Sequence, residues 1–252
     1  MSTNATIVNP LRGVLLAAGL HYRTFFRGSR LWSGPALLLL PVLFTLLSVT
    51  QGYQLAFFEQ GIAPNTLFGG LALLVPLLYA GSAWSEEVER KTITYLLLRP
   101  TPRYALYLGK VLCSSLVSCG LFLIAELLCF GIIATTYSAE LLTLRLQDLA
   151  HHCAAIFFAA MAYGALFSFI GVLLPKFSLM VSIAYGALIE VLLPALPVSF
   201  RYITIQHNVR VVARVELVPD WPGALLYLGL YTVIFLGLGA LLASKRDYTF
   251  GD

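Results

Sequence analysis

Residues 109–135 read GKVLCSSLVSCGLFLIAELLCFGIIAT, and this stretch decides the fold class of the chain. Only Lys110 and Glu126 carry a charge in it. A helix of about 20 apolar residues crosses the ~30 Å hydrocarbon layer of a bilayer, so the stretch is long enough to span a membrane. The whole chain has the same character: 59% of its 252 residues are hydrophobic and 11% are charged, whereas soluble domains carry about 25% charged residues. We therefore predict an integral membrane protein.

Five more apolar runs of similar length flank this stretch, separated by short polar segments. We predict transmembrane helices at 31–50, 66–84, 109–135, 153–174, 177–198 and 223–243. Transmembrane helices tolerate Pro35, Pro41 and Pro76, whereas Pro194 and Pro197 are expected to break the outer end of the fifth helix. Transmembrane strands would instead alternate in segments of about ten residues. The predicted fold is an all-α polytopic membrane protein with six transmembrane helices in a domain that spans 31–243.

The basic residues fall unevenly on the two sides of this predicted membrane domain. Four lie on one side, namely Arg145, Arg201, Arg210 and Arg214. Twelve lie on the other, namely Arg12, Arg23, Arg27, Arg30, Arg90, Lys91, Arg99, Arg103, Lys110, Lys176, Lys245 and Arg246. Cytoplasmic segments carry the excess of Lys and Arg, so both termini, including the tail 244–252, are predicted to be cytoplasmic. Orientation also accounts for the net charge of +4, so no nucleic acid partner is expected.

Residues 1–30 are predicted to form a cytoplasmic N-terminus that contains an amphipathic helix from about 11 to 30. Helical periodicity puts an apolar set on one face, namely Leu11, Val14, Leu15, Ala18, Tyr22, Phe25 and Phe26. The opposite side carries Arg12, Arg23, Arg27 and Arg30. We interpret the segment as an interfacial helix on the inner leaflet, with its arginines near lipid phosphates. The alternative is a soluble helix that packs on another domain.

The densest charge cluster is SEEVERKTITYLLLRPTPRYALYLGK, from Ser85 to Lys110. Glu86 with Arg90, and Glu87 with Lys91, have the i, i+4 spacing that stabilises a helix, so the second helix is expected to run past the membrane surface. Thr101 is predicted to cap a new helix, with Pro102 in its first position. The apolar residues between the two helices are predicted to form a docking surface, and they are Ile93, Tyr95, Leu96, Leu97 and Leu98.

This segment resembles the loop between the second and third helices in permease subunits of type-2 ABC transporters. The features shared are an acidic cluster, a basic pair followed by Thr92, a run of leucines, Arg99-Pro100 and a Gly109-Lys110 that opens the next helix; Lys91 stands where glycine is usual. The resemblance implies a loop, 85–108, that couples the permease to a separate cytoplasmic ATPase. It assigns the coupling role to Glu86, Glu87, Glu89, Arg90, Lys91, Thr92, Leu96, Leu97, Arg99 and Arg103.

What the resemblance implies for the whole protein is a multi-pass exporter subunit in the inner membrane of a prokaryote, assembled as two permeases with two ATPases. ATP and Mg²⁺ would bind to the ATPase. The chain itself agrees, because Gly109-Lys110 lacks the upstream glycine and the following Ser or Thr of a phosphate-binding loop. The sequence indicates neither a catalytic residue nor a cofactor of its own.

Two glutamates, Glu126 and Glu190, lie inside predicted transmembrane helices, where an ionised group costs ~2.5 kcal/mol or more. Each should face a partner or a wet cavity, and both are candidates for a substrate path. The alternative interpretation, held equally open, is that they are protonated or hydrogen-bonded packing contacts between helices. His151-His152-Cys153 is interpreted as a polar collar rather than a metal site, because neighbouring helical residues converge poorly on one ion. The four cysteines show no CxxC spacing, which leaves disulfides and zinc unsupported.

Two further segments are left with open interpretations. Ala160, Gly164 and Ser168 form a small-residue stripe that suits a close helix contact, either internal or between two copies. The external segment 199–222 is predicted as either an amphipathic helix or a short β-ribbon. In the resembled family this position carries short external helices that gate the exit, and an extracytoplasmic partner protein could also dock there.

Two other classes of protein compete with the permease interpretation. An ion-coupled secondary transporter would show an inverted repeat, and none is evident. The Glu86-Glu87 pair is similar to the paired glutamates of membrane-embedded CAAX-type proteases, which need histidines deep in other helices. All four histidines, His21, His151, His152 and His207, fall outside the centres of the predicted helices.

Overall fold

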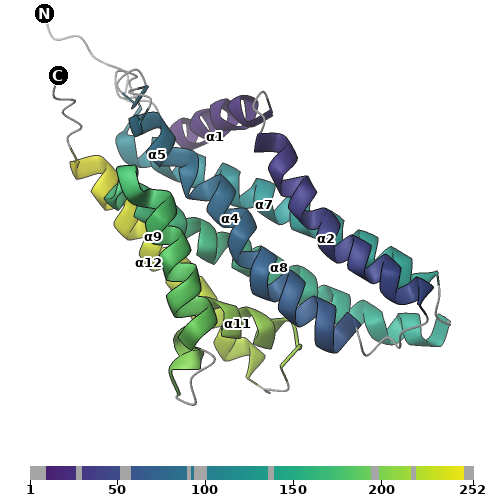
Figure 1. Ribbon diagram of the computed structural model, residues 1–252. Helices are drawn as coiled ribbons and strands as arrows, with labels where there is room; N and C mark the ends of the chain where they lie inside the picture. Colours follow the sequence, from purple (N-terminus) through teal and green to yellow (C-terminus); the bar gives the residue numbers. More distant parts are fainter. Residues whose placement is uncertain are drawn as a thin grey trace, which may run out of the picture.

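A computed structural model of the chain describes residues 10–26, 30–51, 58–89, 92–93, 101–135, 139–193, 199–216 and 220–246 (Figure 1). Over these residues the fold is helical and contains no strand. Six helical stretches are long and apolar enough to cross a membrane, which confirms the predicted all-α architecture: Trp32–Thr50, Asn65–Glu89, Arg103–Ala134, Asp148–Leu173, Pro175–Leu192 and Trp221–Lys245.

Several of these stretches are built from more than one helical element. The first, third, fourth and sixth are α2 (Arg30–Thr50), α7 (Arg103–Ala134), α8 (Ala139–Leu173) and α12 (Trp221–Lys245). The second joins η1 (Phe58–Leu71, π-helical), α4 (Ala72–Ala80) and α5 (Ser82–Glu89), and the fifth joins η2 (Pro175–Phe177), α9 (Ser178–Tyr185) and η3 (Gly186–Leu192). Outside them lie α1 (Pro10–Phe26), η4 (Ser199–Ile203) and α11 (Ile205–Val212).

The centre of the bundle is α8, which packs against α4, α7, α11 and α12. Within an apolar 18-residue stretch of each span, 72% is buried in the span formed by α8, compared with 17% in the span formed by α12. The side chains of Tyr163 and Phe167 on α8 are fully buried, as is that of Phe68 on η1. By contrast α2, α9 and α12 expose many large apolar side chains, as expected of surfaces whose solvent is lipid hydrocarbon.

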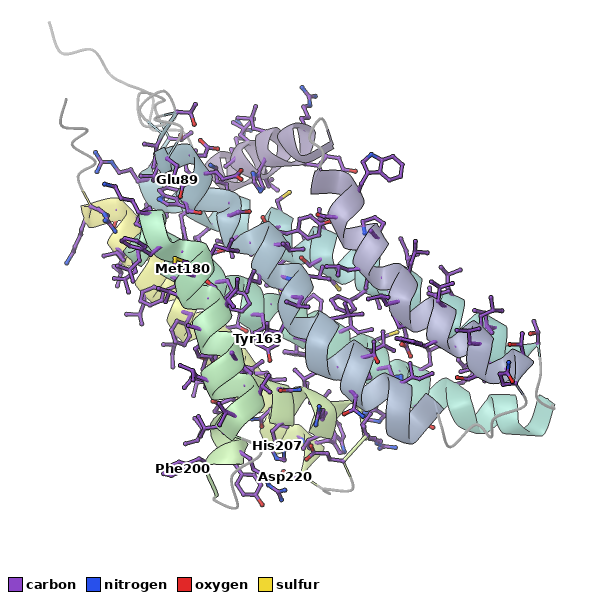
Figure 2. The ribbon with its side chains drawn as sticks, in the orientation of Figure 1. Glu89, Tyr163, Met180, Phe200, His207 and Asp220 are labelled. Atoms are coloured by element: carbon purple, nitrogen blue, oxygen red, sulfur yellow. The ribbon has the colours of Figure 1, made fainter. Side chains whose placement is uncertain are left out.

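The bundle has two distinct ends. One end, called the α5 end below, holds α5, α1, the start of α7 and the last turn of α12 (Figure 1). The other, called the α11 end, holds η4, α11 and the start of α12 (Figure 1). Figure 2 shows the labelled Glu89 at the first end and the labelled His207 and Asp220 at the second. The predicted cytoplasmic loop and the helices nearest both termini therefore share one end of the molecule.

The second span bends between α4 and α5, at Gly81. Its backbone carbonyls at the bend accept hydrogen bonds from two serines of other spans: Ser168 Oγ donates to Ala80 O at 3.0 Å and Ser178 Oγ donates to Gly81 O at 3.0 Å. A Cβ atom on Gly171 would lie 2.9 Å from Gly81 O, so only glycine fits this contact. The predicted stripe that includes Ser168 is thus an internal contact with α4, one of its two anticipated roles.

Helix α1 packs against the first turns of α7 through small residues. A Cβ atom on Gly109 would lie 2.5 Å from Val14 O and 2.7 Å from Ala17 Cβ. One turn further on, His21 Nε2 lies 3.0 Å from Ser114 Oγ. The face that packs on the bundle is therefore the small one, and large residues of the predicted apolar face, Leu11, Leu15 and Tyr22, are exposed.

Two local predictions need correction or completion. Thr101 does not cap the third span: α7 begins at Arg103, its N-cap is Pro102 without a side-chain cap bond, and Pro102 O accepts from the amides of Ala105 and Leu106. The external segment between the fifth and sixth spans forms a helix, α11, rather than a β-ribbon. Thr204 caps it, since its Oγ1 accepts from the His207 amide at 3.3 Å.

Candidate functional site

A buried ion pair joins α5 to α7 at the α5 end. Lys110 Nζ pairs with Glu87 Oε1 and also donates to Ala83 O at 3.4 Å. It lies 5.5 Å from the centroid of the Trp84 ring, a cation–π contact. The Lys110 side chain is 5% exposed and that of Glu87 is 26% exposed. Because a buried ammonium group needs a partner, Glu87 is fixed toward the interior of the bundle.

A second set of long-range contacts ties three helix ends together beside this pair. The Arg246 guanidinium donates to the last carbonyls of α8, to Leu173 O at 2.8 Å and to Val172 O. Arg103 Nη1, at the start of α7, donates to Arg246 O at 3.1 Å. A cation at the C-terminal end of a helix is favourable, because the unpaired carbonyls there carry partial negative charge. The start of α7 and the C-terminal ends of α8 and α12 are thereby linked.

The predicted coupling residues are distributed unevenly at this end. Glu89 and Thr92 are exposed, whereas Glu86 and Arg103 are partly buried and Glu87 is engaged by Lys110. For Ile93 the prediction of an exposed apolar surface is wrong, since this side chain is 1% exposed and packs in a cluster with Trp84 and Tyr107. The other four residues predicted for that surface lie outside the described residues. The remaining coupling residues lie outside the described residues: Arg90, Lys91, Leu96, Leu97 and Arg99.

Helix α1 presents a different character on each of three sides. Arg12 and Arg23 are exposed on one side, where Leu16 is exposed as well, while Gly13 and Ala17 face α7 on another. The third side carries the exposed large apolar residues described above. Such a helix suits the boundary between lipid and water next to α7. Of the other arginines predicted for this surface, Arg27 and the side chain of Arg30 lie outside the described residues.

Glu126, in the third span, is hydrogen-bonded to a residue of the fourth. His152 Nδ1 lies 2.6 Å from Glu126 Oε1, and the two side chains are 13% and 3% exposed. Glu126 Oε2 is buried and accepts no hydrogen bond from the described residues. The His152 ring also packs edge-on against Phe68, with ring centroids 5.0 Å apart. The histidine that was assigned to a polar collar is therefore the partner of the intramembrane glutamate.

Glu190, in the fifth span, anchors α11. Its carboxylate accepts from Tyr163 Oη at 3.1 Å and from Tyr185 Oη at 2.8 Å. The amides of Ile205 and Gln206, in the first turn of α11, donate to it at 3.2 Å and 2.8 Å. A carboxylate at a helix N-terminus satisfies amides that have no partner within the helix. Four protein donors surround this group, which favours the predicted contact role over the substrate path.

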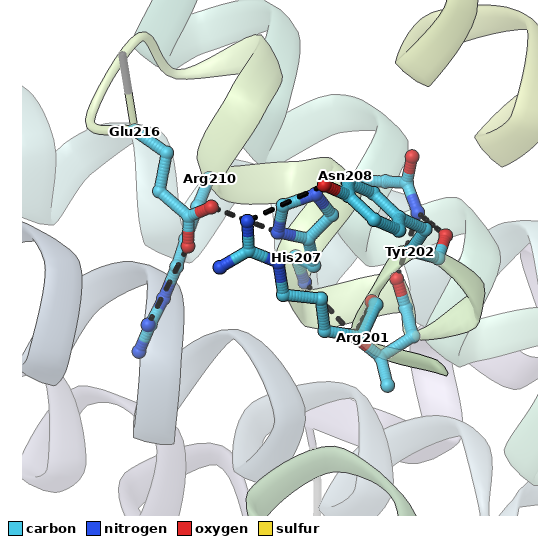
Figure 3. Close-up of polar contacts among 7 residues, drawn as sticks. Arg201, Tyr202, His207, Asn208, Arg210 and Glu216 are labelled. Carbon is cyan, nitrogen blue, oxygen red and sulfur yellow. Dashed lines mark hydrogen bonds and ion pairs between the residues drawn. The ribbon is translucent and has the colours of Figure 1, made fainter. Parts of the chain in front are cut away.

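The α11 end carries its own polar cluster (Figure 3). His207 Nδ1 lies 2.8 Å from Glu216 Oε2, and Arg210 Nη1 lies 3.9 Å from Glu216 Oε1. The His207 hydrogen bond and the charges of Arg210 and Arg201 hold the pKa of Glu216 below its ordinary value, against the opposing effect of partial burial. Asn208 Nδ2 donates to Tyr202 O at 2.9 Å. The segment 199–216 thus has polar contacts among its own residues, in addition to its packing on α8 and α12.

Two hollows on the bundle are lined by described residues that do not include Glu126 or Glu190. One, of about 350 Å³, lies between α2 and α7, and its walls are apolar residues such as Pro35, Val42 and Leu121. The other, of about 360 Å³, lies between α2 and η1 and includes Ser48, Gln51 and Thr66.

The described residues contain no group of three or more His, Cys, Asp or Glu side chains that could hold a metal ion. The cysteines, Cys113, Cys119, Cys129 and Cys153, are present as free thiols. The contacts of the histidines also do not favour a CAAX-type protease. His152 and His207 bond to Glu126 and Glu216, while Glu87 of the paired glutamates bonds to Lys110.

A scan against protein-family models and a search of curated proteins found no match to this chain.

The pairs described here differ in how far the sequence pointed to them. Periodicity predicted a pair of Glu87 with Lys91, which lies outside the described residues, whereas the fold pairs Glu87 with Lys110, 23 positions away. The partner of Glu126 is 26 positions away. A signal did exist for both, because a charge within an apolar run demands a partner. Glu87 lies at the end of the second span that is near Lys110 in the third, and His152 lies at the end of the fourth span that is near Glu126 in the third.

Proposed function

We propose that this chain is the permease subunit of a type-2 ABC transporter in the cytoplasmic membrane of a prokaryote. It works with a separate cytoplasmic ATPase, which holds ATP and Mg²⁺, and two copies of each subunit form the working unit. The chain exports a substrate and catalyses no covalent step itself. In this arrangement the α5 end faces the cytoplasm, together with both termini.

The observation that carries the proposal is the connection of the charged loop to the core of the bundle. The loop segment begins as α5, which is set off from α4 by the bend at Gly81 and ends at the exposed Glu89. The Glu87–Lys110 pair then ties α5 to the buried part of α7. A displacement of α5 by a partner would therefore move both the second and the third spans, which is what coupling to an ATPase requires.

The resemblance of residues 85–110 to the coupling loop supports the same proposal, because it is this loop that the family uses to contact its ATPase. The division of labour at the α5 end fits as well. Glu87 and Ile93 face the interior, whereas Glu89 and Thr92 remain exposed for a partner. We assign the exposed residues to docking and the buried ones to transmission.

Orientation is supported by charge. The basic residues at the α5 end include Arg12, Arg23, Arg103, Lys245 and Arg246, and cytoplasmic segments are the ones enriched in such residues. We place α1 on the inner leaflet, with Leu11 and Leu15 in the acyl region and its arginines near lipid phosphates. The packing of α1 on α7 would hold it at that level.

A second candidate function is an ion-coupled secondary transporter. The observation in its favour is the Glu126–His152 pair, since buried ionisable pairs inside spans occur in proton relays. It predicts a stable assembly that transports without any ATPase.

Affinity purification of the tagged chain in mild detergent, followed by identification and stoichiometry of what accompanies it, tests the proposal. We expect a cytoplasmic ATPase in a two-to-two complex. The triple substitution of Glu89, Arg90 and Leu97 by alanine should release the ATPase, whereas Asp220→Ala, which changes an exposed residue at the α11 end, should not. A stable assembly that contains no ATPase would overturn the permease proposal and favour the second candidate.

A further inference from the structure

Among the described residues, the contact between Glu126 and His152 leaves one buried carboxylate oxygen, Glu126 Oε2, without a hydrogen-bond donor. The carboxylate has two oxygens, and a hydrogen bond from the described residues reaches Oε1 alone, at 2.6 Å from His152 Nδ1. Glu190 provides the comparison, because four donors reach its two oxygens. An ionised carboxylate in an apolar interior needs donors on both oxygens, so the two glutamates are not equivalent.

Among the described residues, the titratable side chains that interact with Glu126 are the thiols of Cys129 on α7 and Cys153 on α8. His151 and Asp148 also lie on this part of α8, and Arg214 interacts electrostatically with His151. None of these side chains donates a hydrogen bond to Glu126 Oε2. Phe68 of η1 contributes an aromatic ring, and Thr45 of α2 a hydroxyl beside Cys129. His151 points elsewhere, with its ring 5.4 Å from that of Trp221.

Electrostatics then decides which form of the pair is stable. If Glu126 were ionised and His152 protonated, the buried oxygen Oε2 would carry negative charge with no donor. If the carboxyl group keeps its proton on Oε1, it donates to a neutral imidazole at Nδ1, and Oε2 is an uncharged carbonyl oxygen. An unpaired neutral oxygen costs less to bury than an unpaired charged one. The neutral pair is therefore favoured.

We propose that Glu126 and His152 form a proton-binding site between the third and fourth spans, which holds one proton on the carboxyl group of Glu126 and donates it to His152. The site does not depend on the proposed transport function.

Infrared spectroscopy of the purified full-length chain in lipid nanodiscs tests this site, since a protonated carboxylic acid and a carboxylate absorb at different frequencies. We expect a carboxylic acid band at neutral pH that shifts in D₂O. It should be absent from Glu126→Gln. The matched variant Glu190→Gln, which changes the other buried glutamate, should retain it.

Two results would overturn the proposal: a difference spectrum between the parent and Glu126→Gln that contains only carboxylate bands, or a band that is lost in Glu190→Gln instead. His152→Phe keeps Glu126 in place and serves if Glu126→Gln does not fold. There the acid band should persist and move toward the frequency of a carboxyl group without a hydrogen bond. A band that His152→Phe leaves unmoved would contradict the assignment of His152 as the acceptor.

Discussion

The α5 end and the α11 end of the bundle are held together in different ways. At the α5 end the polar contacts join segments far apart in the chain, as in Lys110 with Glu87 and Arg246 with the carbonyls of α8. At the α11 end most polar contacts lie within 199–216, and Glu190 with its tyrosines links that segment to the spans. The polar contacts at the α5 end join different spans, whereas most of those at the α11 end lie within one segment.

This difference indicates which contacts a movement of either end would keep and which it would break. Cross-braces between α5, α7, α8 and α12 make the α5 end respond as one body to a displacement of the loop. A change in the position of α11 could keep the polar contacts within 199–216, but it would have to break the hydrogen bonds to Glu190 and the packing of buried residues such as Ile205 and Val209 against α8 and α12.

The largest expected effect comes from breaking the cross-brace. Glu87→Ala leaves the ammonium group of Lys110 buried without its partner, which should cost about 3 kcal/mol or more of stability. Thermal denaturation in detergent measures this loss, and Glu89→Ala, at the exposed neighbour, serves as the control without effect. The double variant Glu87→Leu/Lys110→Met should recover most of the loss. A Glu87→Ala protein as stable as Glu89→Ala would show that the pair does not brace this end.

A smaller effect is expected where α1 joins the α5 end. Gly109→Ala places a Cβ atom 2.5 Å from Val14 O, so α1 must shift, at a cost of about 1–3 kcal/mol. Gly120→Ala, in the same helix, meets nothing within 4 Å and should be neutral or slightly stabilising. Denaturation midpoints of the two variants check this, and equal midpoints would mean that α1 does not pack on α7 as described.

The number and order of the spans could be predicted from sequence because hydropathy and length suffice for that. The fold of 199–216 could not, since β-branched residues such as Val209 and Val211 favour strands locally, and burial against α8 and α12 decides for the helix. The Thr204 cap was the available signal. The packing of α1 was also missed, although Gly13 and Ala17, four positions apart, mark a close helix contact.

The candidate site was harder to predict than the fold. Sequence reasoning identified Glu126 and Glu190 as groups in need of partners, but their partners come from other spans and from α11. Spacing along the chain does not encode such contacts. It also paired Glu87 with its neighbour in the helix, because i, i+4 pairs are the only ones that periodicity reveals.

The α11 end should show a pH dependence of its own. The folded pKa of Glu216 is lowered by His207 first and then by the arginines, so its stabilising contribution is present above the ordinary carboxyl pKa and is lost as pH falls through the folded value. Glu216→Gln should therefore flatten the acid side of the stability profile between about pH 5 and about pH 3. Hydrogen exchange of 205–212 against pH measures this, and identical profiles for both proteins would contradict it. The effect should be modest, since the pair is partly exposed.

The smallest effect is expected at the C-terminal end of α11. Arg214 has φ of 56°, a left-handed conformation that favours glycine and costs other residues about 1 kcal/mol. Arg214→Gly should therefore raise the protection of α11 against hydrogen exchange slightly, while the protection of the helices at the α5 end is unchanged. A loss of protection would indicate that the arginine side chain contributes more than its backbone costs.

The central claim is that the α5 end docks a cytoplasmic ATPase, and photo-crosslinking in native membranes tests it most directly. A photoreactive amino acid replaces Glu89 at one end or Asp220 at the other, both exposed in the fold. The account predicts a crosslink to an ATP-binding protein from position 89 and none from position 220. A crosslink to such a protein from position 220, or none from position 89 in a folded chain, would contradict it.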